Sequence, residues 1–299
     1  MEIVDILIFF AMCIISYLIG GISVARFITS KEKDGGIKQQ GSGNPGTMNM
    51  LRTHGIFMGL FTLLCDALKG VLPALFGLLY FGQYDIETAY MALFVFGFFA
   101  VIGHIYPVYY KFKGGKGIAT TFGVFMVADP ISTIILFGIL FLVLYFIKIG
   151  SVVSLLMITI NAIIQLFKDY MENNWVAIVF MWVMVVLDIY AHRINIKRLL
   201  INKEHPAELQ EGFQKDIEKI KNKRQKKLDR VAEKQGRIED KYDRKINRKI
   251  EKVQKQLDKF SDNQENIKEK AKNSLKTENQ ELQINDTQNN TESIKKTDE

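Results

Sequence analysis

The chain has 299 residues, of which 48% are hydrophobic and 24% are charged, and its formal net charge is +7. Residues 201–299 hold 25 of the 39 Lys and Arg and 21 of the 32 Asp and Glu, so the charge is concentrated in the last third. This division gives no argument for nucleic-acid binding and indicates a membrane protein with a charged tail. Cys13 and Cys65 lie in apolar runs without metal-ligand spacing, and we expect no disulfide framework, metal or cofactor.

Seven apolar runs follow one another between residues 3 and 190. A perpendicular membrane span needs roughly 20 residues, a length that the first two runs exceed and several others do not reach. Short runs still cross where flanking aromatic and lysine side chains reach the interface. The sequence predicts an all-α polytopic membrane protein with about seven transmembrane helices, within a range of five to eight, at residues 3–25, 56–80, 90–103, 117–128, 131–147, 152–167 and 175–190. The Asp129-Pro130 step is expected to be a turn between two helices.

Lysines alternate between the loops that join these runs. The loops after the first, third and fifth runs are basic, and the loops between them are neutral to acidic; the lysines concerned are Lys31, Lys33, Lys38, Lys111, Lys113, Lys116 and Lys148. The positive-inside rule then places the basic loops and the C-terminus in the cytoplasm and the N-terminus outside. Glu2 and Asp5 argue against a cleaved signal peptide, so the first run is expected to remain as a span.

The sequence divides into a membrane domain, residues 1–205, and a charged cytoplasmic tail, residues 206–299. Ile246, Ile250, Val253 and Leu257 follow helical spacing, which predicts a long charged helix or weak coiled coil to about residue 273. Beyond that point the composition is typical of disorder. The tail is expected to contact anionic lipid headgroups or an unidentified protein, and lipid is the preferred partner.

The first basic loop contains three glycines, two hydroxyls and two amides in nine residues, and this stretch ends shortly before Arg52. Such a loop presents backbone N–H groups to a phosphate, Ser42 and Asn44 add side-chain contacts, and Arg52 adds a planar fork of donors. The same residue types also dominate ordinary surface turns.

The second basic loop, residues 103–121, places Lys116 between Gly115 and Gly117 directly before an apolar helix. A phosphate at that point would receive the lysine charge and the helix N-terminus together. The spacing differs from the nucleoside-triphosphate P-loop. Lys111 is explained by the positive-inside rule alone, whereas the glycines around Lys116 favour a functional lysine.

Several other polar residues are candidates. His192 and Asn195 are three apart and are expected to share a helix face at the cytoplasmic end of the last span, where His192 is a candidate general base. Asp66 and Lys69 lie inside the second span and form either a functional pair or a buried ion pair that orders the bundle. Ser151 faces the same cytoplasmic side or caps a helix.

In combination, these segments resemble the bacterial membrane glycerol-3-phosphate acyltransferases that use acyl phosphate as donor (PlsY-type). The resemblance covers residues 1 to about 205, with the motifs in the same order and at the same spacing. The matching motifs are Gly41-Ser42-Gly43-Asn44-x-Gly46-x-x-Asn49-x-x-Arg52, Leu64-x-Asp66-x-Leu68-Lys69-Gly70, Gly103-His104-x-x-Pro107 with Phe112-Lys113-Gly114-Gly115-Lys116-Gly117-x-Ala119-Thr120, and His192-Arg193-x-Asn195-Ile196 with Arg198-Leu199-Leu200 and Glu204.

The resemblance implies a seven-helix plasma-membrane enzyme whose active site faces the cytoplasm. It implies transfer of an acyl chain from acyl phosphate to the 1-hydroxyl of sn-glycerol 3-phosphate, giving 1-acylglycerol 3-phosphate and phosphate, with neither coenzyme A nor acyl carrier protein as the direct donor. The catalytic residues it implies are Ser42, Arg52, Lys116, His192 and Asn195, with Asp66, Lys69 and Glu204 structural. The expected substrate-binding residues are Gly41, Gly43, Asn44, Gly46, Asn49, His104, Lys113, Gly114, Gly115, Gly117, Thr120 and Ser151.

The sequence departs from the family pattern at three places, and two other functions stay open. One departure is Ala191, which precedes His192 where the family frequently has an arginine. Gly20-Gly21-Ile22-Ser23 stands where the family commonly has G-S-I-P, and Met48 replaces a small polar residue in the first loop. A transporter or channel for a phosphorylated anion would use the same loops as a selectivity site. A membrane anchor whose working part is the tail is the third interpretation.

Overall fold

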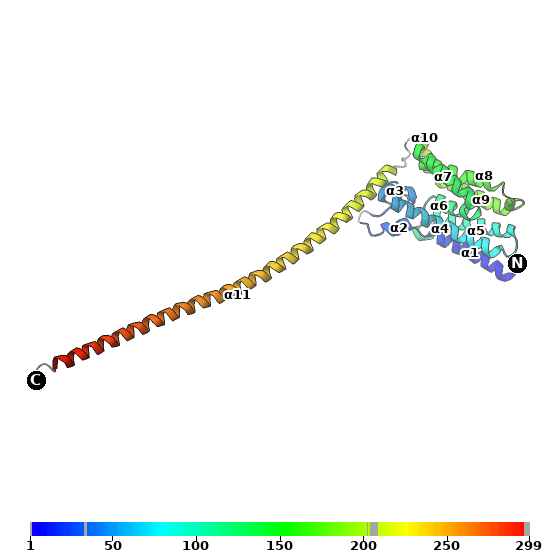
Figure 1. Cartoon of the computed structure of the whole chain (residues 1–299). Coiled ribbons are helices and arrows are strands. Elements are labelled where there is room, and N and C mark those ends of the chain that lie inside the picture. The colour runs from blue at the N-terminus through cyan, green and yellow to red at the C-terminus, as the bar shows by residue number, and fades with distance from the viewer. Residues whose placement is uncertain (1, 33–34, 202, 204–208, 296–299) are drawn as a thin grey trace. The chain divides into compact units, whose positions relative to one another are not determined.

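The computed structural model describes residues 2–32, 35–201, 203 and 209–295. Every regular element within these residues is helical (Figure 1), which confirms the all-α prediction. The elements are α1 (Ile3–Gly21), α2 (Val24–Thr29), α3 (Thr47–His54), α4 (Ile56–Phe81), α5 (Ile86–Ile105), η1 (Val108–Tyr110), α6 (Ile118–Ala128), α7 (Pro130–Ile147), α8 (Gly150–Gln165), η2 (Asp169–Met171), α9 (Trp175–Ala191), α10 (Arg193–Leu200) and α11 (Leu209–Lys295).

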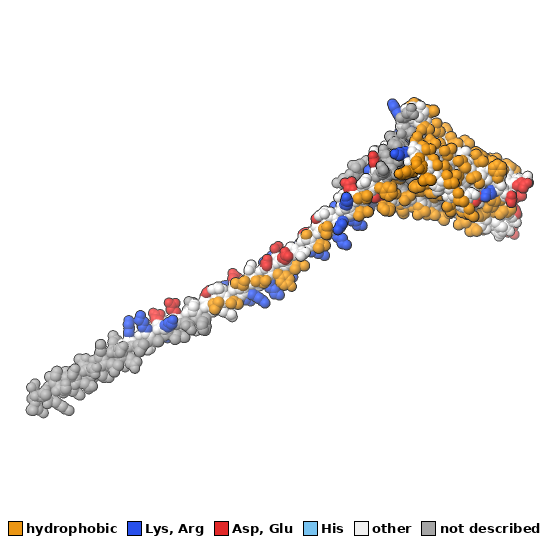
Figure 2. Space-filling model, turned by 45° about the horizontal axis from the view of Figure 1, so that its top comes forward, with side chains coloured by type: hydrophobic (Ala, Val, Ile, Leu, Met, Phe, Trp, Pro, Cys, Tyr) orange, Lys and Arg blue, Asp and Glu red, His pale blue; other side chains and the backbone are white. Residues whose placement is uncertain are grey.

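Four stretches in the described residues are long and apolar enough to cross a bilayer: Ile3–Thr29, α4, Ile86–Tyr110 and α7. A fifth span results if α9 and α10, which are bent by 53° at their junction, are counted together. The apolar helices α6 and α8 are shorter, and the prediction of seven crossings requires both of them. Hydrophobic side chains cover most of the visible face of the helical bundle (Figure 2), as expected for a surface in contact with lipid tails.

Helix α5 occupies the middle of the bundle. Its side chains are buried on several sides, and it packs against α1, α4, α6 and α9. The contact with α1 is close because glycines replace larger side chains: a Cβ on Gly20 would lie 2.0 Å from the carbonyl oxygen of Ala100, and a Cβ on Gly103 would lie 2.0 Å from that of Tyr17. Small residues allow this backbone-to-backbone packing between membrane helices, where no hydrophobic effect drives association.

Glycines also allow close backbone packing between α4 and α6. A Cβ on Gly70 would lie 2.0 Å from the carbonyl oxygen of Thr120, and one on Gly123 would lie 2.0 Å from that of Ala67. The Thr120 hydroxyl donates to the carbonyl oxygen of Asp66 at 3.0 Å. Together these contacts fix the start of α6, and therefore the loop that carries Lys116, against the middle of α4.

The predicted turn at Asp129-Pro130 is confirmed. Helix α6 ends at Ala128, and the Asp129 carboxylate accepts from the Ser132 N–H at 3.2 Å as the N-cap of α7. Pro130 is the first residue of α7, a position where its missing N–H has no cost.

The chain separates into two compact units, residues 1–221 and 222–299. Helix α11 begins in the first unit, and within the second unit it continues to Lys295. The helix therefore passes residue 273, where the composition predicts a change to disorder, and both that change and the domain boundary at residue 205 stay predictions.

We expect Gly123→Val to destabilise the membrane domain, because the added side chain must displace α4. Overpacking of this kind costs about 1–3 kcal/mol, equivalent to roughly 5 °C in the midpoint of thermal unfolding. The matched control is Gly138→Val in α7, where a Cβ meets nothing within 4 Å. Thermal unfolding in detergent measures both variants, and equal midpoints would contradict the close-packing account.

Candidate functional site

A cavity of about 220 Å³ lies among α3, α4, α6, α7 and α8. Its polar lining consists of Ser42, Asn44, Thr47, Asn49, Arg52, Asp66, His104, Lys116, Ser151, Ser154, His192 and Asn195. Its apolar lining comes from the bodies of α4, α7 and α8 and includes Leu60, Leu63, Phe137, Leu140, Phe141, Leu144 and Met157. Leu60 and Phe141 are also about half exposed, at 50% and 52%, so the apolar part opens on the outer surface of α4 and α7. The cavity therefore suits a ligand with a polar head and an apolar chain.

Asn49 on α3 holds the first loop in shape. Its side-chain oxygen accepts from the Ser42 N–H at 2.9 Å, and its amide nitrogen donates to the carbonyl oxygen of Gln40 at 3.0 Å. Gly41 and Gly43 have φ of +55° and +70°, a region that favours glycine, and a Cβ on Gly41 would lie 2.3 Å from the Asn49 oxygen. Asn49 lines the cavity, and its side-chain amide forms hydrogen bonds with the first loop. These bonds hold the loop in the shape in which Ser42 and Asn44 also line the cavity.

Three helix N-termini meet at the polar lining. Thr47 begins α3, Gly117 precedes α6, and Gly150 and Ser151 begin α8, and all four residues line the cavity. The first N–H groups of a helix have no intrahelical partner, and the helix dipole makes this end attractive to anions. The hydroxyls of Thr47 and Ser151 are buried without a hydrogen-bond partner among the described residues. An anionic ligand with several oxygen atoms would accept hydrogen bonds from these N–H and hydroxyl groups.

The second loop is shaped by glycines. The N–H groups of Gly114 and Gly115 donate to the carbonyl oxygens of Ile105 and His104, each at 3.0 Å, which holds the loop against the end of α5. A Cβ on Gly115 would lie 2.1 Å from Nε2 of His104. The Lys116 ammonium donates to the side-chain oxygen of Asn195, so the second loop and α10 meet at the cavity.

The expectation that His192 and Asn195 share one helix is wrong, because the chain bends at His192. Helix α9 ends at Ala191, α10 begins at Arg193, and the two axes differ by 53°. The bend coincides with a hydrogen bond of 2.8 Å between Nδ1 of His192 and the carbonyl oxygen of Asp188. Because a carbonyl oxygen only accepts, Nδ1 carries the hydrogen, and Nε2 is the nitrogen that can take up a proton. Both residues still line the cavity.

Asp66 and Lys69 form the expected buried pair within α4, with 2.5 Å between Lys69 Nζ and Asp66 Oδ1. Nδ1 of His104 lies 3.9 Å from the same oxygen. Asp66 and His104 line the cavity and Lys69 does not. The pair thus neutralises charge inside the bundle and also borders the polar lining.

All five residues expected to be catalytic line the cavity. Of the residues expected to bind substrate, some line it and others do not. Cavity-lining residues are Asn44, Gly46, Asn49, His104, Gly117 and Ser151, whereas Gly41, Gly43, Lys113, Gly114, Gly115 and Thr120 do not line it. Lys113 is exposed, and its carbonyl oxygen accepts from Arg26. Thr120 is fully buried against α4, because its hydroxyl bonds Asp66. Glu204 lies outside the described residues.

Sequence reasoning missed Asp188. This carboxylate is fully buried in α9, and its Oδ2 accepts from the Thr121 hydroxyl at 2.7 Å. A Cβ on Gly117, whose φ is +91°, would lie 1.8 Å from its Oδ1. A charge-bearing residue inside the apolar run at 175–190 was the available signal, since ionisable residues in membrane spans usually have a role. Asp188 therefore links the second loop to the base of the His192 bend.

Met48 also lines the cavity, and a Cβ on Gly150 would lie 3.0 Å from its Cε. The replacement in the first loop thus packs against the start of α8. Among the described residues, no group of three or more His, Cys, Asp or Glu is placed to hold a metal ion.

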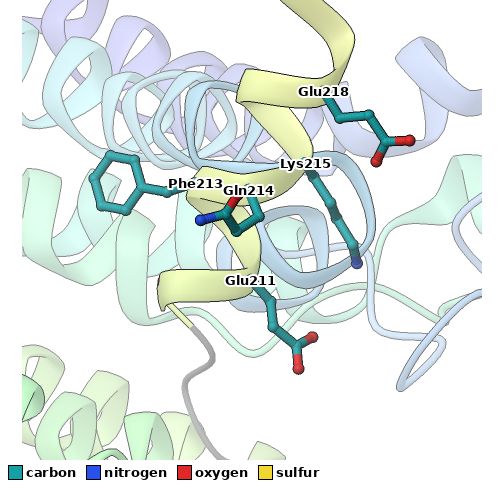
Figure 3. Close-up of a pocket in the computed structure, with 5 residues that line it drawn as sticks. All are labelled: Glu211, Phe213, Gln214, Lys215 and Glu218. Carbon is teal, nitrogen blue, oxygen red and sulfur yellow. The ribbon is translucent and has the colours of Figure 1, made fainter.

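A second hollow, of about 680 Å³, lies beside the beginning of α11 (Figure 3). Its described lining consists of Glu211, Phe213, Gln214, Lys215 and Glu218, all from that one helix. It includes no residue of the anion-binding loops, so it is not the candidate site.

Fold and cavity define a class: an integral membrane protein whose helix N-termini and basic side chains meet an apolar groove open to lipid. The glycerol-3-phosphate acyltransferase family profile matches residues 10–202, and the chain belongs to this family. The glycerol-3-phosphate acyltransferase of Finegoldia magna is 37% identical over 194 residues, 64% of this chain and 92% of that protein. That of Bacillus subtilis is 33% identical over 195 residues, 65% of this chain and 95% of that protein.

Two solved structures are similar in fold and sequence. The crystal structure of PlsY (YgiH), an integral membrane glycerol 3-phosphate acyltransferase, in its glycerol 3-phosphate form has a TM-score of 0.60 and 31% identity, covering 66% of this chain and 94% of that chain. Its lysophosphatidic acid form has a TM-score of 0.59 and 30% identity, covering 69% and 98%.

We expect Thr121→Val to destabilise the protein, because it leaves the buried Asp188 carboxyl without its only donor among the described residues. An unsatisfied buried polar group costs about 1–3 kcal/mol. Thr121→Ser keeps the hydroxyl and serves as the control. A larger fall in the midpoint of thermal unfolding for valine than for serine supports the bond, and an unchanged midpoint in Thr121→Val contradicts it.

Proposed function

We propose that this protein transfers an acyl chain from acyl phosphate to the 1-hydroxyl of sn-glycerol 3-phosphate. The products are 1-acylglycerol 3-phosphate and inorganic phosphate. Membership of the glycerol-3-phosphate acyltransferase family supports the acceptor and the reaction class. The acyl phosphate donor rests on the resemblance of the four motifs.

The single observation that carries the proposal is the two-part lining of the cavity. Arg52, Lys116 and three helix N-termini provide positive potential and N–H donors for the phosphates of the two substrates. The apolar side chains of α4, α7 and α8 provide a groove for the acyl chain. A water-soluble acceptor and a lipid-soluble donor meet where these two surfaces join.

The proposed chemistry is direct attack without a covalent enzyme intermediate. The 1-hydroxyl oxygen bonds to the carbonyl carbon of the donor, the bond from that carbon to the phosphate oxygen breaks, and inorganic phosphate leaves. The hydroxyl proton passes either to a phosphate oxygen of the donor or to Nε2 of His192. Ser42, Arg52, Lys116 and Asn195 hold the phosphates of the two substrates, and Lys116 also opposes the charge that develops in the transition state.

The proposed topology has seven crossings, with α6 and α8 as the short ones. The basic loops that carry Arg52 and Lys116 then lie at the cytoplasmic side of a bacterial plasma membrane, with the N-terminus outside and α11 in the cytoplasm. A location at the cytoplasmic face gives the site access to a soluble phosphorylated acceptor.

The proposal is tested with purified full-length protein, labelled glycerol 3-phosphate and one of three donors: palmitoyl phosphate, palmitoyl-CoA or palmitoyl carrier protein. We expect labelled 1-acylglycerol 3-phosphate from palmitoyl phosphate alone. Lys116→Ala is expected to lower kcat/KM by about a hundredfold or more, because it removes a charged donor from the reacting phosphate.

The matched control is Lys111→Asn, which removes a lysine from the same loop at an exposed position with φ of +53° that asparagine tolerates. Its kcat/KM is expected to stay within about twofold of wild type, since exposed charges contribute little. Absence of acyl transfer from every donor by folded protein contradicts the proposal, and transfer from palmitoyl-CoA alone contradicts the choice of donor.

We expect Met157→Trp to shift the preference toward shorter acyl chains, because the indole fills part of the apolar lining. Fitting the longer chain against the indole is overpacking, which costs about 1–3 kcal/mol, so kcat/KM for palmitoyl phosphate is expected to fall about fivefold or more. The measurement compares palmitoyl phosphate with octanoyl phosphate. Phe146→Trp, at a 73% exposed position of α7 outside the cavity, is the control. An unchanged chain-length ratio in Met157→Trp would place the acyl chain elsewhere.

A further inference from the structure

The beginning of α11, residues 209–221, docks on the corner between α3 and α4 through one face of the helix. The contacting residues are Gly212, Lys215, Asp216 and Lys219, spaced i, i+3, i+4 and i+7. This spacing places all four on the same side of a helix. We call residues 209–221 the docking segment; all of them lie in the first compact unit.

Asp216 acts as a cap for α4 from 159 residues away. Its Oδ2 accepts from the Phe57 N–H at 3.1 Å, in the first turn of α4, and its side chain is only 6% exposed. The N-cap residue of α4 is Gly55, which has no side chain to supply this bond. A Cβ on Gly55 would lie 2.1 Å from Oδ1 of Asp216, so the glycine makes room for the carboxylate. A negative charge at a helix N-terminus is favourable both as an acceptor and toward the helix dipole.

Two lysines of the docking segment bind the other side of the corner. Lys215 Nζ donates to the carbonyl oxygen of Arg52, and Lys219 Nζ donates to that of His54 at 2.6 Å. These carbonyls belong to the last turn of α3, where a helix has unsatisfied acceptors and its dipole favours cations. Gly212 completes the contact, since a Cβ there would lie 3.0 Å from Ile56 and 3.3 Å from Leu51.

The docked corner carries part of the candidate site. Helix α3 has only eight residues, and it supplies Asn49, which holds the first loop, and Arg52. A short isolated helix is unstable in water, so its position depends on its contacts. The lysine bond to the Arg52 carbonyl thus acts on a residue that lines the cavity. The family match ends at residue 202, before α11, so the docking segment lies outside the matched range.

We propose that the docking segment, through Lys215, Asp216 and Lys219, holds the α3–α4 corner in place and thereby positions Arg52 for the phosphate it binds, an inference that rests on the proposed function. Asp216 is a positioning residue: it acts through α3 and touches no reacting atom. Residues 209–221, which the sequence assigns to the charged tail, are thus linked to the candidate site.

The test compares full-length Asp216→Ala and Asp216→Asn with wild type. Asparagine keeps an acceptor for the Phe57 N–H and caps helices as well as aspartate, whereas alanine removes it. We expect Asp216→Ala to raise KM for one phosphorylated substrate about fivefold, the factor that loss of a helix cap typically gives, with kcat within twofold. Asp216→Asn is expected to behave as wild type. Glu218→Ala, which removes an exposed carboxylate from the same helix, is the control.

The variant Arg52→Lys is measured first, with both substrates. The substrate whose KM rises is the one that Arg52 binds. If Asp216 acts through Arg52, adding Asp216→Ala to Arg52→Lys raises that KM no further, because the two effects share one cause. Additive effects of the two substitutions overturn the proposal.

Amide hydrogen exchange at residues 49–60 provides a readout independent of activity. Faster exchange in Asp216→Ala than in Asp216→Asn is the expected result. Equal exchange in wild type and Asp216→Ala overturns the docking contact, and faster exchange with unchanged KM values overturns the positioning role. Wild type that transfers no acyl group refutes the proposed function, while the exchange result still decides whether docking occurs.

If Asp216→Ala fails to fold, the double variant Lys215→Ala and Lys219→Ala replaces it. Lys215 is half-buried and the Lys219 bond lies at an exposed site, so these substitutions disturb the folded core less. It is expected to raise the same KM about twofold to fivefold, and an unchanged KM overturns the proposal.

Discussion

The glycine contact between α4 and α6 is the constraint on which the site depends. Gly70 and Gly123 let the two backbones touch, and this closeness lets Thr120 bond the carbonyl oxygen of Asp66. The register fixed there sets where α6 begins, and the loop before α6 carries Lys116 and Gly117. A larger side chain at either glycine would separate the second loop from α4, and the cavity would lose one of its three helix N-termini. Packing inside the apolar bundle thus determines where the residues of the polar cavity lining are placed.

Two buried carboxyl groups of the bundle have side-chain partners. The Asp66–Lys69 pair and the Asp188–Thr121 bond both lie beside the cavity, where a buried carboxyl needs a donor or a cation. Each of them braces a segment that lines the cavity: Asp66 faces His104, and Asp188 lies against Gly117 while its carbonyl oxygen bonds His192. These two buried carboxyl groups therefore lie close to the place where an anionic ligand is expected.

The sequence predicts the helical class, the Asp129-Pro130 turn and the residues that the cavity gathers, because glycine-rich loops with basic residues between apolar runs indicate anion binding at a membrane surface. It does not predict the bend at His192, since a hydrogen bond between a ring nitrogen and a carbonyl leaves no mark on periodicity. Lys113 and Thr120 show the converse limit: both belong to the right motif, but a motif does not say which side chains face inward. The Asp216–Phe57 contact joins residues 159 apart in the chain, and no local pattern reports such a pairing.

The lateral opening of the cavity has a kinetic consequence. Leu60 and Phe141 border the cavity and are also about half exposed on the bundle surface, so a chain lying there is continuous with the surrounding hydrocarbon. For the proposed reaction, donor and product would exchange sideways within one leaflet and would never cross water. Rates would then follow the mole fraction of donor in the membrane rather than its bulk concentration. Adding inert lipid at constant total donor would slow the enzyme by surface dilution, while the acceptor would continue to obey ordinary solution kinetics.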